Sequence, residues 1–92
     1  MMNTTDLDKG VVENILKRLR RIEGQVRGLQ KMIEDGRSCE EVLTQMTATK
    51  KAMESTSTLI LQEFLTLCAA DIARGDDRKP AQIATMLRKF TL

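Results

Sequence analysis

The sequence predicts an all-α protein built from three helices. Apolar residues recur at three- and four-residue spacing along two long segments, as the buried face of a helix requires. No segment alternates apolar and polar residues in the manner of a half-buried strand. The chain has 92 residues, of which 41% are hydrophobic and only two are aromatic, so its core must be aliphatic. A chain of this length forms a single domain, residues 1–92, and such helices commonly complete their cores by oligomerising.

The first helix is predicted over residues 9–35, after a polar lead-in, residues 1–8, that we expect to be frayed. Its apolar residues alternate between spacings of three and four, which is the heptad pattern of a helix packed along its whole length against another helix. These seam residues are Val12, Ile15, Leu19, Ile22, Val26, Leu29 and Ile33. Gly36 then supplies a C-terminal stop.

The second helix is predicted over residues 38–74. Ser38 followed by Glu41 matches a capping box at its start, and Gly75 with the charged residues after it ends the helix. A short third helix is predicted over residues 80–89, with Pro80 in its first turn. Its inner side is expected to carry Ile83, Met86, Leu87 and Phe90.

The only two cysteines, Cys39 and Cys68, belong to one apolar stripe of the second helix. They are 29 positions apart. At about 1.5 Å of rise per residue this separates them by roughly 43 Å, so they cannot meet within one chain. If two copies of the helix pack antiparallel, Cys39 of one protomer lies beside Cys68 of the other, and a two-thiol site forms twice per dimer.

The two thiols differ in their expected environments. Cys39 follows the Ser38 cap, where the helix dipole and Arg37 favour a thiolate while Glu40 and Glu41 oppose it. Cys68 lies in the apolar run LTLCAA, which suits a resolving thiol of ordinary or raised pKa.

Three uses of this pair stay open. The first is a covalent switch that detects oxidants or sulfur donors by bridging. The second is a soft-metal site for Cu(I), and the third is a pair of inert core cysteines. Zinc is disfavoured because it normally takes four ligands and the chain contains no His. We expect no cofactor.

The first helix carries a concentrated positive charge. Seven basic and two acidic residues lie between Lys9 and Lys31, a local net charge of +5. Away from the seam project Lys17, Arg20, Arg21, Arg27 and Lys31. A solvated face usually mixes signs in i,i+4 pairs, whereas a stripe of one sign is typical of phosphate binding. Lys50 and Lys51 add positive charge on the second helix, which we place away from the cysteine stripe.

Several classes of function are disfavoured. An enzyme is not expected, because without His the chain offers no evident general base. No apolar run approaches the ~20 residues of a membrane span and no signal peptide is evident, so we expect a cytoplasmic protein without a membrane partner. A thiol-dependent sulfur carrier and a helical oligomerisation module remain as alternatives to DNA binding.

Residues 18–53 read RLRRIEGQVRGLQKMIEDGRSCEEVLTQMTATKKAM. This run resembles the signature of the copper-sensing operon repressor (CsoR/RcnR) family, and the similarity covers residues from about 15 to 83. The resemblance implies an antiparallel dimer forming a four-helix bundle, a tetramer made of two such dimers, and repression by binding operator DNA. It also implies DNA-binding roles for Arg18, Arg21 and Lys50, to which the charge pattern adds Lys17, Arg20 and Arg27.

Departures from the family pattern indicate a branch. Copper sensors carry a His four residues before the final Cys, and this chain has Phe64 there. Ser38 replaces a Tyr, and no acidic residue follows Asp77. Two thiols without the His resemble the CstR-like sulfurtransferase-repressor branch. That branch senses persulfides and other sulfane sulfur through di- or polysulfide bridges.

The resemblance therefore implies a repressor of sulfide-detoxification genes that responds to persulfide or polysulfide inducers through a bridge between Cys39 and Cys68 of the partner protomer. The alternative within the same class is a Cu(I)-responsive repressor that uses the same two thiolates. No other metal is expected.

Overall fold

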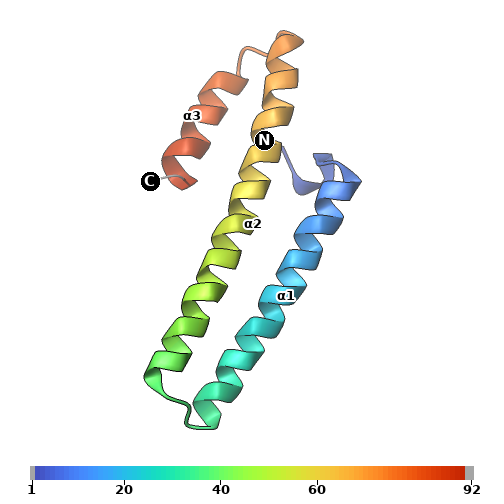
Figure 1. Ribbon diagram of the computed structural model, residues 1–92. Coiled ribbons are helices and arrows are strands. Elements are labelled where there is room, and N and C mark those ends of the chain that lie inside the picture. Colours follow the sequence, from blue (N-terminus) through green and yellow to red (C-terminus); the bar gives the residue numbers. More distant parts are fainter. Residues whose placement is uncertain (1, 91–92) are drawn as a thin grey trace.

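The computed structural model describes residues 2–90 and contains a short 3₁₀ turn followed by three α-helices, with no strand in this part of the chain (Figure 1). The elements are η1 (Thr4–Asp6), α1 (Lys9–Glu34), α2 (Cys39–Ala73) and α3 (Lys79–Phe90). The prediction of a three-helix, all-α protomer is confirmed. Each helix end lies within one residue of its predicted position, from the predicted ranges 9–35, 38–74 and 80–89.

α1 and α2 form a long antiparallel hairpin, and α3 folds back against the last turns of α2 (Figure 1). The molecule is elongated and thin, with extents of 57 × 28 × 14 Å. Two helices side by side cannot cover each other completely, so each keeps an uncovered flank. Within residues 2–90 no helix is both long and apolar enough to cross a bilayer.

Two glycines end the long helices. Gly36 adopts φ +70°, a left-handed conformation that costs glycine little. The Gly36 N–H donates to the Ile33 carbonyl at 3.1 Å and the Arg37 N–H to the Met32 carbonyl at 2.9 Å, the pairing of a Schellman motif. Gly75, at φ +96°, ends α2 with the same pattern of hydrogen bonds.

The capping box predicted at the start of α2 is half formed. The Ser38 hydroxyl accepts a hydrogen bond from the Glu41 N–H at 3.2 Å, as predicted. The Glu41 carboxylate instead pairs with the Arg37 guanidinium at 2.6 Å. A carboxylate is attracted more strongly by a guanidinium, which carries a full positive charge, than by a neutral backbone N–H, which explains the change of partner.

The lead-in that we expected to be frayed contains a 3₁₀ turn at Thr4–Asp6 within its described residues, 2–8. Asn3 and Asp6 close the 3₁₀ turn, since the Asn3 N–H donates to Asp6 Oδ2 at 2.9 Å. Leu7 is buried and lines an apolar groove with Phe64 of α2. One apolar side chain within the polar segment therefore anchors it to the helices. Residue 1 lies outside the described residues.

The heptad seam of α1 is divided between two surfaces. Ile15, Ile22 and Leu29, seven residues apart, are 4–8% exposed because they pack against α2. Leu19, Val26 and Ile33 are also seven residues apart, but they are 37–61% exposed. One set of the heptad therefore builds the hairpin, while the other remains uncovered in the protomer.

The apolar stripe of α2 is divided along its length. Leu43, Met46 and Met53 in the first half are exposed, whereas Phe64 and Cys68 in the second half are buried where α3 packs. On α3, Ile83, Met86 and Leu87 are partly buried, as predicted, but Phe90 is exposed. Phe90 belongs to the last turn of α3, where it borders an open groove rather than a packed neighbour.

Candidate thiol site and cationic cavity

Cys39 is the first residue of α2, and its side chain is exposed. Ser38, directly before Cys39, caps the helix. Arg37 and Glu41, two residues before and two residues after Cys39, form an ion pair. The Arg37 charge is therefore matched by Glu41, so Arg37 is not the free cation expected beside the thiol. In the protomer, the Cys39 sulfur is open to a reactant or to a second copy of the chain.

Cys68 has no exposed surface. Burial raises the pKa of the Cys68 thiol above its ordinary value of 9.0, while the charge of Lys79 partly offsets this and Asp71 and Asp76 reinforce it. The raised pKa expected from the apolar run LTLCAA is thus confirmed in direction, and its main cause is desolvation. Under neutral conditions Cys68 is a protonated thiol shielded from solvent.

The protomer does not bring the two thiols together. Their spacing of 29 residues is about eight turns of a regular helix, so Cys39 and Cys68 lie on the same side of α2 but near its opposite ends. Among residues 2–90, no cluster of three or more His, Cys, Asp or Glu side chains is placed to hold a metal. A complete two-thiol site therefore requires a second protomer.

The junction of α2 and α3 next to Cys68 is polar. Lys79, the first residue of α3, pairs with Asp71 at 3.3 Å, and both side chains are largely covered. Arg74 also hydrogen-bonds Asp71, and these two cationic partners lower the pKa of the Asp71 carboxyl. Gln82 Oε1 is buried nearby without a hydrogen-bond partner. One ion pair thus ties the start of α3 to α2 three residues beyond Cys68.

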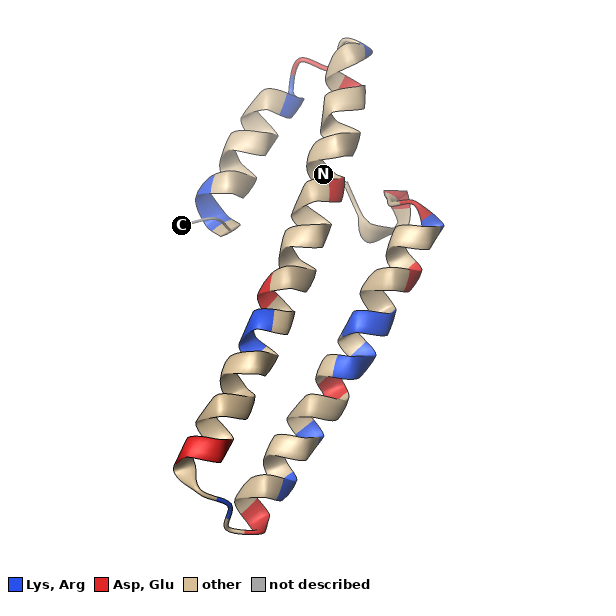
Figure 2. Cartoon of the chain, viewed as in Figure 1, with Lys and Arg blue, Asp and Glu red and all other residues tan. Residues whose placement is uncertain are grey.

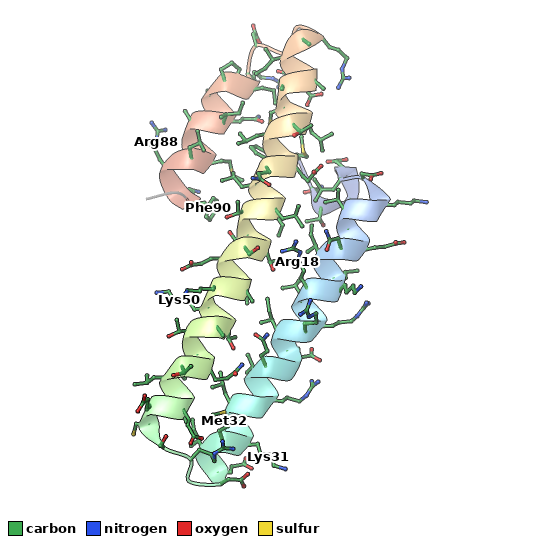
Figure 3. The ribbon with its side chains drawn as sticks, in the orientation of Figure 1. Arg18, Lys31, Met32, Lys50, Arg88 and Phe90 are labelled. Carbon is green, nitrogen blue, oxygen red and sulfur yellow. The ribbon has the colours of Figure 1, made fainter. Side chains whose placement is uncertain are left out.

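A second candidate site is a cationic cavity of about 330 Å³ between α1 and α2. Its polar and charged lining residues are Asn14, Lys17, Arg18, Arg21, Gln25, Ser55 and Thr56. Arg18 Nε donates to Asn14 Oδ1 at 3.2 Å, and Arg18 Nη1 donates across the hairpin to Ser55 Oγ at 3.0 Å. Figure 3 shows Arg18 between the two helices. Neither Lys17, Arg18 nor Arg21 takes part in an ion pair within the described residues.

The other predicted DNA-binding residues do not line this cavity. Basic residues recur along α1 (Figure 2), but Arg20 and Arg27 do not line the cavity, and Arg27 pairs with Glu23 at 2.8 Å. Lys50 projects from the side of α2 that faces away from α1 (Figure 3). Its eleven-residue separation from Cys39 is about three turns, so Lys50 lies on the cysteine side of α2. The sequence-based placement of Lys50 away from the cysteine stripe is therefore wrong.

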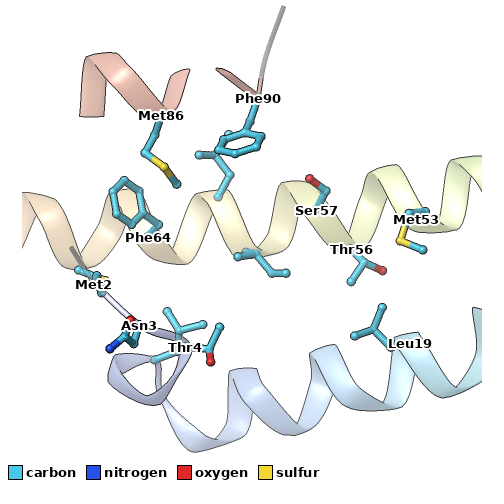
Figure 4. Close-up of a pocket in the computed structure, with 13 residues that line it drawn as sticks. Met2, Asn3, Thr4, Leu19, Met53, Thr56, Ser57, Phe64, Met86 and Phe90 are labelled. Atoms are coloured by element: carbon cyan, nitrogen blue, oxygen red, sulfur yellow. The ribbon is translucent and has the colours of Figure 1, made fainter. Parts of the chain in front are cut away.

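An apolar groove lies on the other side of the hairpin. Its volume is about 340 Å³, and Leu19, Met53, Phe64, Met86 and Phe90 contribute to its wall (Figure 4). Thr56, buried between the two helices, lines both the groove and the cationic cavity. The hairpin thus has one cationic flank and one apolar flank.

The sequence-based interpretation missed Asn14, Gln25 and Ser55. Asn14, Arg18, Arg21 and Gln25 are spaced by four, three and four residues, which is one stripe of a helix. That spacing could have placed Asn14 and Gln25 beside Arg18 and Arg21 from the sequence alone. Nothing in the sequence indicated Ser55, since its place opposite Arg18 depends on how the hairpin packs.

Comparison with known proteins extends these observations. Residues 12–89 match the family model described as "Metal-sensitive transcriptional repressor". The chain is 37% identical over 81 residues to the copper-sensing transcriptional repressor CsoR of Bacillus subtilis, covering 86% of this chain and 80% of that protein. It is 40% identical over 82 residues to the copper-sensing transcriptional repressor RicR of Mycobacterium tuberculosis, covering 85% of each.

A solved structure is similar over the whole chain. The copper-sensing repressor CsoR with Cu(I) from Geobacillus thermodenitrificans superposes with a TM-score of 0.82 at 34% identity, covering 100% of this chain and 95% of that one. These relatives are described as copper-sensing repressors, and the sulfur-responsive branch predicted from the sequence is not confirmed by them. The chain belongs to the family of metal-sensitive transcriptional repressors.

Proposed function

We propose that this chain is an operator-binding repressor that releases DNA when a thiol-directed inducer joins Cys39 of one protomer to Cys68 of its partner. The observation that carries the proposal is the division of the hairpin into two flanks. Arg18, Arg21 and Lys17 gather on one flank, and exposed apolar side chains gather on the other. Protein contacts and DNA contacts can therefore form at the same time.

The apolar flank supports assembly from copies of this chain. Leu19, Val26 and Ile33 on α1 and Leu43, Met46 and Met53 on α2 are exposed in the protomer. Such a surface on a hairpin is covered when a second hairpin packs against it to form a four-helix bundle. An antiparallel arrangement brings the Cys39 end of one hairpin to the Cys68 end of the other. The tetramer, a pair of such dimers, belongs to the same proposal.

Cu(I) is the inducer that the copper-sensing relatives favour. Thiolates are the ligands that soft Cu(I) prefers, and Cys39 with the partner's Cys68 would provide two of them. The donor set of one Cys39 and one partner Cys68 fits this requirement, whereas it does not fit zinc. When bound, the ion would supply a bridge between protomers. The chain's own part is to provide the two sulfurs and to exclude water at Cys68, whose thiol would lose its proton to the solvent on binding the ion.

A persulfide is the second candidate, favoured by Phe64. Phe64 is buried one helical turn before Cys68, so a hydrocarbon stands where a third donor would be expected. The reaction needs a sulfane-sulfur donor that converts Cys39 to its persulfide. The Cys68 thiol then gives up its proton and attacks the inner sulfur of that persulfide, so that a disulfide forms between protomers and the outer sulfur leaves as hydrosulfide, which takes up the proton. The sulfane sulfur is thereby reduced to sulfide while the two cysteines are oxidised.

One experiment tests the function and separates the inducers. Binding of the reduced, Cu(I)-loaded and polysulfide-treated protein to its own promoter DNA is measured side by side, with Cys39→Ala and Cys68→Ala as controls. We expect tight, salt-dependent binding by the reduced protein. Release by Cu(I) in the presence of a competing chelator supports the copper sensor, and release with a protomer-to-protomer bridge in non-reducing mass spectra supports the sulfur sensor.

Two outcomes would contradict the proposal. Promoter binding that is absent or insensitive to salt would leave a helical oligomerisation module. Release of DNA by either inducer in both cysteine variants would show that the thiols are not the sensing site.

A further inference from the structure

Arg18 makes two side-chain hydrogen bonds, more than any other predicted DNA-binding residue makes within residues 2–90. Its guanidinium donates to Asn14 on its own helix and to Ser55 on α2. The Arg18–Ser55 bond, between residues 37 positions apart, is the single direct side-chain hydrogen bond that joins α1 to α2 in the described part of the chain. Lys17 and Arg21 beside it have no such bond within residues 2–90.

The two acceptors are neutral, which determines what the bonds can do. A carboxylate in their place would cancel the charge of Arg18, as Glu23 does for Arg27. A hydroxyl and an amide oxygen orient the guanidinium and leave its positive charge uncompensated. Nη2 makes none of these bonds, so it can donate to a phosphate oxygen.

We propose that Asn14 and Ser55 are positioning residues that hold Arg18 for a phosphate of operator DNA. The inference rests on the proposed function, because it presupposes that the cationic cavity meets DNA. It assigns roles to two uncharged residues that need not themselves contact the phosphate. Preorganisation removes part of the conformational entropy that a long, free side chain loses on binding.

The position of Ser55 makes this contact sensitive to helix packing. Ser55 belongs to the same helix as Cys39 and Cys68, whereas Arg18 and Asn14 belong to α1. The bond spans the hairpin, so it persists only while the two helices keep their relative positions at this level. A shift of α2 along α1 separates donor and acceptor and frees the guanidinium.

The test measures promoter affinity as a function of salt for the variants Ser55→Ala, Ser55→Thr, Asn14→Ala and Arg18→Ala, with Ser57→Ala as matched control. Ser57 is the same residue type two positions along α2 and lines the apolar groove instead. Ser55→Ala and Asn14→Ala are each expected to lower affinity about three- to tenfold, which corresponds to the loss of one hydrogen bond. Their salt slope should stay unchanged, whereas Arg18→Ala should reduce the slope by about one.

Two further comparisons isolate positioning from structure. Ser55→Thr keeps a hydroxyl and is expected to retain wild-type affinity, while helix content and oligomer mass should match for all variants. The double variant Arg18→Ala with Ser55→Ala should bind no more weakly than Arg18→Ala, because Ser55 acts through Arg18.

The positioning role is overturned if Ser55→Ala and Asn14→Ala bind like the wild type while Arg18→Ala is weakened, or if Ser55→Ala weakens binding further in the absence of Arg18. Failure of the proposed function looks different, because then the wild-type protein shows no salt-dependent promoter binding at all.

Discussion

Cys39 and Cys68 lie on the same side of α2, yet Cys39 is exposed and Cys68 has no exposed surface in the protomer. A disulfide requires its sulfurs to come within about 2.05 Å, and a shared metal ion also needs access to both. The region that must open is the α2–α3 junction, where α3 packs over the last turns of α2. Access to Cys68 is therefore part of the proposed induction mechanism.

The first prediction concerns thiol reactivity. In reduced protein, Cys39 should be alkylated by a maleimide at least tenfold faster than Cys68, because only Cys39 is open to solvent and Cys68 is a buried, protonated thiol. Time-resolved mass spectrometry of peptides containing each cysteine measures both rates. Unfolding in urea is the control and should bring the two rates close together. Equal rates in the folded protein would show that α3 does not shield Cys68.

Asp71 gives the second prediction. Asp71→Asn removes the carboxylate that pairs with Lys79 at 3.3 Å and with Arg74, which weakens the attachment of α3. We expect faster alkylation of Cys68 with little change in the rate at Cys39. Glu63→Gln, on the same helix but in none of the ion pairs of residues 2–90, is the matched control. If both variants alkylate alike, the ion pair does not hold the junction closed.

The third prediction is a pH dependence. The pKa of Cys68 is raised above 9.0 in the folded protein, so below pH 9 its thiol is protonated in both folded and unfolded states and contributes no slope. As pH rises above 9, the unfolded chain loses this proton first, and the free energy of unfolding falls. Urea denaturation across this range should show a steeper decline for the wild type than for Cys68→Ala. A parallel decline in both proteins would contradict the assignment to Cys68.

A fourth prediction addresses assembly. Met46→Asp places a charge on the exposed apolar flank of α2, whereas Thr47→Asp places the same charge on a neighbouring exposed position outside that flank. Burying an unpaired carboxylate in an interface is costly, so Met46→Asp should lower the oligomer mass in analytical ultracentrifugation while Thr47→Asp should not. Identical masses for the two variants would argue against the flank as the interface.

The fifth prediction is a stability change at the start of α2. Ser38→Ala removes the hydroxyl that accepts the Glu41 N–H and should lower the free energy of unfolding by about 0.5–2 kcal/mol in urea denaturation. Thr44→Ala, six residues later, is the control and should change stability less, since the Thr44 hydroxyl donates to a carbonyl within the helix. An equal loss of stability in both variants would show that the Ser38 cap contributes no more than the Thr44 hydroxyl does.

The sequence was sufficient for the local structure. Apolar spacing located the three helices, and Gly36, Ser38 and Gly75 located their ends, because periodicity and caps act within one segment. The placement of Cys39 and Cys68 on one side of one helix also follows from spacing, since a regular helix has a known pitch.

Only the tertiary structure decided which neighbours each face meets. The spacing of Leu19, Val26 and Ile33 is the same as that of Ile15, Ile22 and Leu29, yet one set is exposed and the other buried. A heptad pattern indicates contact with a helix but not whether that helix belongs to the same chain. The burial of Cys68 under α3 and the bond from Arg18 to Ser55 likewise depend on helix packing, because the residues they join are distant in sequence.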